Sequence, residues 1–183
     1  MSKYLAITGE INEGTYAHTL RFVEETLKED TKDIVIIINS TGGSVDNGFA
    51  IYDLIKSINY LHITTIAIGT CASIATILFA LGDTRLIAPN AIYVLHSASV
   101  RCNNGANMNV VDVKELLEDL QKDNERIFSA LDIAAPTTSS SNYIKEVLSS
   151  GKDYKLDANE VVNKGFATDF LADFPKGNFN SIY

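Results

Sequence analysis

Two residues in this sequence are placed where they could do chemistry together, a serine and a histidine that each follow an apolar run. Ser73 lies in "GTCASIAT", where a β-branched run gives way to a helix-forming run, and His96 ends the run "AIYVLH". A serine hydroxyl becomes a nucleophile when a neighbouring imidazole accepts its proton. The pair therefore predicts nucleophilic hydrolysis if folding brings the two side chains together.

A carboxylate that orients the imidazole would complete such a site. The segment "GKDYKLDANE" offers Asp153 and Asp157. Asp157 has the spacing of a helix cap, with Glu160 as its reciprocal partner. Asp153 lies in the preceding loop and is free to reach elsewhere, so we favour it and keep Asp132 and Asp169 as weaker alternatives.

Backbone amides near the serine could stabilise a developing oxyanion. The N–H of Ile74, at the start of a helix, has no helical acceptor and is free to donate. In "NSTGGSVDNG", Gly42 and Gly43 follow a buried strand, and their N–H groups can point at an anion or a carbonyl oxygen. A Gly-Gly pair also occurs in ordinary strand-to-helix turns. No G-x-G-x-x-G dinucleotide motif is present in the sequence.

The remaining chemically active side chains carry weaker signals. His18 lies on an amphipathic helix and His62 in a polar loop, where surface histidines are common. Cys71 is a minor alternative nucleophile that we interpret as a small buried residue. The two cysteines, Cys71 and Cys102, and the three histidines are scattered without metal-ligand spacing, so no metal is expected.

The elements that must position these groups alternate between strand and helix. Strands are predicted at "YLAITG", "DIVIIINS", "TTIAIG", "RLIA" and "AIYVLH", and helices at residues 15–28, 45–58 and 71–82. The continuously apolar run "DIVIIINS" is typical of a strand buried on both faces. The order predicts an α/β fold with a mostly parallel sheet and crossover helices. Open sheets of this kind hold their sites at the carboxyl ends of the strands.

Helical periodicity gives predictions about buried faces. The helix at 15–28 is expected to face inward with Ala17, Leu20, Val23 and Leu27. Residues 107–131 form a long helix whose apolar stripe consists of Val110, Val113, Leu117, Leu120, Ile127 and Leu131. Such a helix is about 40 Å long, so we expect it to project and bury its stripe against another subunit. A helix that lies across its own domain is the alternative.

The last part of the chain continues with shorter elements. A polar turn at "APTTSS" leads into another helix, "DANEVVNKGF" forms a final helix, and "ATDFLADF" is expected to pair as a last strand. The tail "PKGNFNSIY" is expected to be loosely ordered.

Composition sets the class of protein. A chain of 183 residues favours one domain. The formal charge of −8 argues against nucleic acid or anionic membrane as a partner. Two cysteines indicate a reducing, cytoplasmic setting, and the N-terminus shows no signal peptide. The apolar run at 66–81 is too short for a membrane span and is interrupted by Gly69.

Three segments together resemble a known family. "INSTGGSVDNGFAIYDLI", "IGTCASIATILFALGDTRLIAPNAIYVLH" and "KDYKLDANEVVNKGFATD" are similar, in order and spacing, to the proteolytic subunit of the Clp protease (ClpP), over about residues 4–171. The resemblance implies a ClpP/crotonase-like fold and a serine endopeptidase with Ser73 as nucleophile, His96 as general base and Asp153 as orienting acid.

The resemblance also implies how substrate is held. The backbone N–H groups of Gly43 and Ile74 would form the oxyanion hole. An extended substrate strand would bind along Gly42, Gly43 and Ser44 through main-chain hydrogen bonds. Such binding suits unfolded polypeptides, with little preference among side chains.

An oligomeric chamber is implied as well. The chain would be a single domain over 1–183, with a head at about 1–100 and 153–175 and a handle at about 101–152. Family members stack two seven-membered rings through this handle, so a heptamer or tetradecamer is expected. No cofactor is expected, and ATP would enter only through a partner AAA+ unfoldase.

Several residues depart from the family pattern. Thr41 stands where the family usually has proline, Ile74 where it has methionine, and Ser97 and Ala98 where it has Gln-Pro. The N-terminus is also short, and lacks most of the segment that contacts an unfoldase ring. A virus-encoded capsid-maturation protease would fit these departures. Two further alternatives stay open: a catalytically idle ring subunit, and a crotonase-like acyl-CoA enzyme, because the implied fold also serves acyl-thioester chemistry.

Overall fold

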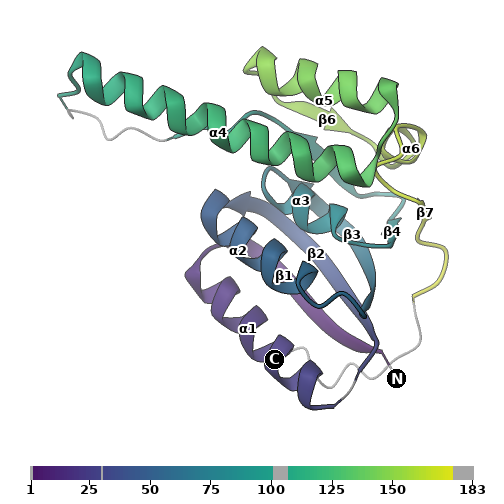
Figure 1. Cartoon of the computed structure of the whole chain (residues 1–183). Helices are drawn as coiled ribbons and strands as arrows, with labels where there is room; N and C mark the ends of the chain where they lie inside the picture. The colour runs from purple at the N-terminus through teal and green to yellow at the C-terminus, as the bar shows by residue number, and fades with distance from the viewer. Residues whose placement is uncertain (1, 30, 101–106, 175–183) are drawn as a thin grey trace.

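The computed structural model describes residues 2–29, 31–100 and 107–174 of the chain (Figure 1). Its elements in chain order are β1 (Lys3–Ile11), α1 (Glu13–Lys28), β2 (Asp33–Gly43), α2 (Val45–Lys56), β3 (His62–Ala72), α3 (Ala75–Ala80), β4 (Thr84–Ile87), β5 (Ile92–Leu95), α4 (Val110–Ala134), α5 (Thr138–Ser150), β6 (Tyr154–Leu156), α6 (Ala158–Asn163) and β7 (Asp169–Phe170).

The strands form one mostly parallel sheet, which confirms the predicted α/β fold. Five strands lie side by side in the order β1-β2-β3-β4-β7, and every pair in this row is parallel. β5 pairs with β3 in parallel, and β6 adds to β5 as the antiparallel member. Helices α1, α2 and α3 pack along one face of this sheet (Figure 1).

The long strand β3 changes neighbours partway along its length. It pairs with β4 from Thr64 to Ala67 and with β5 from Thr70 to Ala72. Between these stretches Gly69 has a φ of +59°, and a Cβ there would lie 2.7 Å from the Oδ1 of Asn39. A glycine is therefore needed at this bend. The bend turns the end of β3 away from β4 and towards the strand that leads to the histidine.

The core has a layer on each face of the sheet. Within β2, Ile34, Ile36 and Ile38 belong to the large cluster that includes side chains of the covering helices, whereas Val35 and Ile37 belong to a small cluster with Tyr4 and Ile66. All five of these β2 residues are buried. This pattern confirms the prediction of a strand buried on both faces.

The predicted inward face of α1 is only partly right. Val23 is buried as expected, but Leu27 is 48% exposed. The buried residues of the helix are Thr19, Phe22, Val23 and Thr26. The hydroxyls of Thr19 and Thr26 donate to helix carbonyls one turn earlier, at 2.9 and 2.7 Å. Because these polar groups are already paired, they can be buried and take positions that periodicity assigned to apolar residues.

The third helix is shorter than predicted. We expected it to span 71–82, but β3 continues to Ala72 and α3 spans only Ala75–Ala80. Cys71 and Ala72 pair with β5, and this pairing overrides the helix-forming composition of the segment. The final helix, in contrast, has the predicted cap, since the side chains of Asp157 and Glu160 bond each other's backbone N–H groups at 2.9 and 3.0 Å. The predicted last strand is also present as β7.

Helix α4 projects from the body as predicted (Figure 1). Near its start, Val110, Val113 and Leu117 are 85%, 52% and 54% exposed. Near its end, Ile127 and Leu131 are buried in the core. The helix thus has an anchored half and a half whose apolar side chains face solvent. The expected start of the handle, at 101–106, lies outside the described residues.

One side chain fastens the anchored end of α4 to the sheet. The guanidinium of Arg85, on β4, donates to the carbonyls of Gly82 at 2.9 Å, Ala134 at 2.8 Å and Phe166 at 2.8 Å, with a longer bond to Gly165 at 3.3 Å. The planar fork of arginine can serve several acceptors at once. Arg85 therefore connects the ends of α3, α4 and α6.

Within the described residues, no helix has the length and apolar character that a membrane span requires.

Candidate active site

Ser73 occupies a strained turn between β3 and α3. Its φ is +58°, and it is the one non-glycine residue with positive φ among those described. This conformation costs on the order of 1–2 kcal/mol and persists where the surroundings enforce it. The N–H of Ser73 donates to the carbonyl of Val94 at 2.9 Å. Its own carbonyl accepts from Thr76, from the backbone N–H at 2.9 Å and from the hydroxyl at 2.6 Å.

The Gly-Gly pair lies directly against this turn. A Cβ on Gly42 would lie 2.6 Å from the Cβ of Ser73 and 3.1 Å from its hydroxyl oxygen. A Cβ on Gly43 would overlap the carbonyl oxygen of Ile11 on β1. Both glycines also have positive φ, +91° and +152°. The pair is therefore not an ordinary turn, because a side chain at either position would collide with a neighbouring backbone.

The register between β3 and β5 brings His96 beside Ser73. Cys71 pairs with Tyr93 and Ala72 with Val94, so the two chains leave the ladder together. Ser73 and His96 then line the same small cavity of about 60 Å³, along with Gly43, Ile74 and Ile127 among others. No hydrogen bond joins the hydroxyl to the imidazole among the described residues. Hydrogen bonds between catalytic groups often shorten only when substrate binds.

The imidazole of His96 has a defined partner on one side. Its Nδ1 lies 2.6 Å from the carbonyl oxygen of Ser97. A carbonyl only accepts hydrogen bonds, so Nδ1 carries the proton. In the neutral ring this leaves Nε2 with a free lone pair, which is the form that a general base requires.

The register of β5 with β6 puts Asp153 opposite His96 if it is extended by one position, but no hydrogen bond joins their side chains within the described residues. The antiparallel pair β5–β6 ends at Leu95 opposite Tyr154. His96 and Asp153 occupy the next position of this register, where Cα atoms of an ideal ladder are about 5 Å apart. Asp153 is exposed, and its carboxylate makes no hydrogen bond within the described part of the chain. Its role stays a prediction. The short strand β6 was not predicted, because three residues give too little alternation to signal a strand.

The other candidate carboxylates are engaged elsewhere. Asp157 caps α6 and accepts from the N–H of Glu160. Asp132 accepts a hydrogen bond from the hydroxyl of Ser141, which joins α4 to α5. Asp169 accepts from the N–H of Phe170 at 2.7 Å. These contacts leave Asp153 as the candidate carboxylate that has no structural partner among the described residues.

The remaining histidines and the buried cysteine lie apart from this chemistry. His62 is at the opposite end of β3 from Ser73, with Nδ1 3.5 Å from a carboxylate oxygen of Asp83. His18 is partly buried on α1. Cys71 is fully buried, and burial raises the pKa of its thiol above the ordinary value. The described residues contain no group of histidine, cysteine and acidic side chains that could hold a metal ion.

Two further contacts near the site were not found from the sequence. The hydroxyl of Thr76 holds the carbonyl of Ser73, a short-range contact that its spacing could have suggested. Asn124, on α4, accepts from the N–H of Ala98 through its Oδ1 at 2.7 Å. That contact spans 26 residues and depends on how α4 docks, so no local pattern indicates it.

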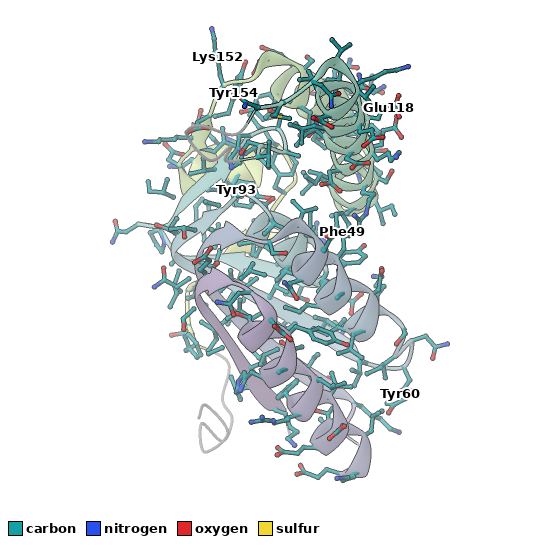
Figure 2. All side chains as sticks on the ribbon, turned by 90° about the vertical axis from the view of Figure 1, so that its left-hand side faces the viewer. Phe49, Tyr60, Tyr93, Glu118, Lys152 and Tyr154 are labelled. Carbon is teal, nitrogen blue, oxygen red and sulfur yellow. The ribbon has the colours of Figure 1, made fainter. Side chains whose placement is uncertain are left out.

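The surroundings of the site differ in depth (Figure 2). Tyr93, from β5, lies in the interior of the molecule and stacks on Phe166 with ring centroids 5.7 Å apart. Lys152 and Tyr154, on either side of Asp153 in the sequence, lie at one end of the molecule, where Lys152 points outward. The β5–β6 region therefore extends from the packed interior at Tyr93 to an exposed edge at Lys152.

Comparison with known proteins identifies relatives along nearly the whole chain. Residues 2–173 match the sequence profile of a family described as Clp protease. The ATP-dependent Clp protease proteolytic subunit of Streptococcus uberis is 32% identical over 142 residues, which cover 76% of this chain and 68% of that protein. The protein of the same name from Streptococcus mutans is 31% identical over 147 residues, 79% of this chain and 71% of that one.

A solved structure has the same fold. A ClpP1 variant from Listeria monocytogenes aligns with a TM-score of 0.78 at 20% sequence identity, covering 98% of this chain and 94% of that one. At this level of identity the likeness bears on the fold alone. It agrees with the ClpP-like arrangement of parallel sheet, crossover helices and projecting helix.

Proposed function

The chain belongs to the Clp protease family and is a serine endopeptidase, and we propose that Ser73 is its nucleophile, His96 its general base and Asp153 its orienting acid. The observation that carries this assignment is the left-handed turn at Ser73, which lies in contact with Gly42 and shares a cavity with His96. A strained serine between a strand and a helix is the arrangement that exposes a nucleophilic hydroxyl.

The proposed chemistry proceeds by acyl transfer. His96 takes the hydroxyl proton through Nε2 as the Ser73 oxygen attacks the scissile carbonyl. It then gives that proton to the leaving amine, and water releases the acyl group from the serine. The negative charge of Asp153 stabilises the imidazolium that forms between these steps.

Two backbone amides are available for the oxyanion. The N–H of Ser44 donates to the carbonyl of Ile11 at 2.8 Å, towards β1. Successive N–H groups of a strand point to opposite sides, so the N–H of Gly43 points away from β1. The N–H of Ile74 precedes the first turn of α3 and has no acceptor among the described residues. We assign these two donors to the oxyanion hole.

Substrate binding follows from where the pairing of β2 with β3 ends. The last pair is Ser40 with Cys71, and beyond it no strand of the described chain pairs with β2 on that side. We propose that an extended polypeptide occupies this edge along Gly42, Gly43 and Ser44 through main-chain hydrogen bonds. This mode suits unfolded chains and depends little on side-chain identity.

The relatives are named as subunits of an ATP-dependent protease. For this chain we propose self-association into rings, a heptamer or a tetradecamer, with the exposed stripe of α4 buried between copies. We also propose that a partner AAA+ unfoldase would bind and hydrolyse the ATP, and that this chain itself needs no cofactor. The free, buried thiol of Cys71 fits the cytoplasmic location that we propose.

The test combines a substrate, a probe and a variant. Purified protein should hydrolyse a fluorogenic peptide and be labelled on Ser73 by a fluorophosphonate. Ser73→Ala should lose labelling and lower kcat by about 10³-fold or more. Equal hydrolysis by the variant would contradict the assignment. A wild-type protein that stays unlabelled would instead indicate the catalytically idle subunit, and light scattering would give the ring size.

A further inference from the structure

We propose that Asn124 is a positioning residue for His96, acting through the peptide group between Ser97 and Ala98. This inference rests on the proposed function, in which His96 is the base. A residue of α4, which is far from the proposed catalytic residues in the sequence, would then help to set the orientation of the His96 imidazole. The two bonds that carry it involve opposite ends of a single peptide group.

Both hydrogen bonds belong to the same rigid plane. The carbonyl of Ser97 accepts from Nδ1 of His96 at 2.6 Å, and the N–H of Ala98 donates to Oδ1 of Asn124 at 2.7 Å. These are the C=O and the N–H of one peptide unit, which is planar and trans here, since the described chain has no cis bond. In a trans peptide the two groups point in opposite directions. Fixing the N–H therefore fixes the direction of the carbonyl that holds the imidazole.

Asn124 is itself well anchored. It lies one helical turn before Ile127, which is buried and lines the cavity shared by Ser73 and His96. Two turns after Asn124, Leu131 is fully buried, and Arg85 holds the carbonyl of Ala134 at the end of the helix. The amide oxygen thus reaches the site from a rigid element, which is what positioning requires.

The chemical consequence is the choice of tautomer. A carbonyl at Nδ1 keeps the proton there and leaves Nε2 as the acceptor for the serine proton. When the N–H of Ala98 donates to Asn124, the peptide group is polarised, and its carbonyl becomes a better hydrogen-bond acceptor. A neutral carbonyl does not replace a negative charge, so Asp153 keeps the separate task of stabilising the imidazolium.

Few charges surround this relay. The residues that line the cavity with His96 carry no side chain that is charged at neutral pH. The nearest charged residue in the β5–β6 register is Asp153, which follows the last pair, Leu95 with Tyr154, by one position, as does His96. Asp123 and Arg126, beside Asn124 on α4, bond each other at 3.0 Å, and Arg126 lies over the ring of Phe49. A change in the tautomer of His96 in Asn124→Leu would therefore result from the lost hydrogen bond and not from a lost charge.

The experiment uses three variants of the full-length protein. Asn124→Leu removes the acceptor at similar volume, Asn124→Asp keeps an oxygen in its place, and Gln121→Leu makes the same kind of change at an exposed position on the same helix. Peptide hydrolysis gives kcat and KM separately. Ring ¹⁵N spectra give the tautomer of His96 in Ser73→Ala protein that also carries His18→Gln and His62→Gln, so this readout does not depend on activity.

We expect Asn124→Leu to lower kcat about three- to tenfold with KM unchanged, the size of one lost hydrogen bond. The Nδ1–H signal should shift towards a mixture of tautomers. Asn124→Asp should keep the wild-type tautomer and most of kcat, and Gln121→Leu should change neither. An unchanged tautomer in Asn124→Leu, or an equal loss in Gln121→Leu, would overturn the inference even if the protein is an active peptidase. A wild-type protein with no activity would overturn the proposed function, while the spectra would still decide this inference.

Discussion

Ser73 and Asp153, the two proposed partners of His96, lie in regions that are built in different ways. Ser73 ends a strand that is paired on both sides and packed under helices, and three hydrogen bonds fix its backbone. Asp153 precedes a strand of three residues at the edge of the sheet, and it is exposed. One group is held by the core and the other by an edge.

This difference indicates where geometry matters and where charge matters. The position of Ser73 depends on contacts that cannot shift without moving β2, β3 or β5. Asp153 can contribute its charge from a range of positions, because Nδ1 of His96 already has the carbonyl of Ser97. Changes near the serine should therefore act through the backbone, and changes at Asp153 should act through electrostatics.

The largest effect is expected at Gly42. In Gly42→Ala the new methyl group would collide with Ser73 and with the carbonyl of Ala72. We expect this collision to displace Ser73, the proposed nucleophile, and a displacement of about 1 Å lowers kcat/KM by roughly 100-fold or more. Peptide hydrolysis measures this loss.

Gly9→Ala is the matched control for Gly42→Ala. Gly9 also has a positive φ, +72°, but a Cβ there would meet nothing within 4 Å. It should cost stability alone, by about 1–2 kcal/mol. If both variants lose activity equally, the close approach at Ser73 is not what matters.

The next effect is expected at Asp153. Asp153→Asn removes a charge without changing the shape of the side chain, and we expect kcat to fall about 10- to 100-fold, the size of one partly screened charge near the imidazolium. Asp157→Asn, which should keep its helix cap, serves as the control. A fall of about 10⁴-fold would mean that the carboxylate, and not the peptide of Ser97, sets the tautomer. No fall at all would remove Asp153 from the site.

A smaller effect is expected at Thr76. Thr76→Val deletes the hydroxyl that donates to the carbonyl of Ser73, and should lower the free energy of unfolding by about 1 kcal/mol. Activity should fall a few-fold, because the turn keeps its backbone bond. Thr65→Val deletes a similar buried hydroxyl, bonded to the carbonyl of Phe79, and should lower stability without changing kcat. Denaturant unfolding and peptide hydrolysis separate the two, and an equal loss of kcat in both variants would contradict this expectation.

The smallest effect is expected at Cys71. Burial raises the pKa of its thiol, so the thiol stays protonated and unreactive at pH 8. In a Cys102→Ser background, iodoacetamide should label folded protein far more slowly than unfolded protein, and Cys71→Ser should retain activity. Rapid labelling that abolished hydrolysis would make Cys71, and not Ser73, the nucleophile.

The sequence predicted the interior better than the edges. The apolar run of β2 and the Asp157 cap are confirmed, because burial on two faces and a capping box leave local patterns. The inward face of α1 was partly wrong, because threonines that bond their own helix can be buried. The continuation of β3 to Ala72 was also missed, because Cys71 and Ala72 look helical until β5 is beside them.

In the candidate site, too, some contacts were predicted from the sequence and others were not. The prediction that Ser73 and His96 meet follows from parallel strands that end at the same edge, and the two residues do share a cavity. The neighbourhood of Asp153 depends on antiparallel pairing by three residues, which leaves no periodic signal. The hydrogen bond between Asn124 and Ala98 depends on how α4 packs against the rest of the protein, so no local sequence pattern could predict it.

The hydrogen bonds of Arg85 have a consequence for the order of folding. Its acceptors at Ala134, Gly165 and Phe166 are separated from it by 49, 80 and 81 residues. Closing loops of this length is slow compared with forming local contacts. A newly synthesised chain should therefore complete the turn at Ser73 before the base of α4 is fastened. During that interval the protein should have the turn at Ser73 formed while α4 is not yet attached to the sheet.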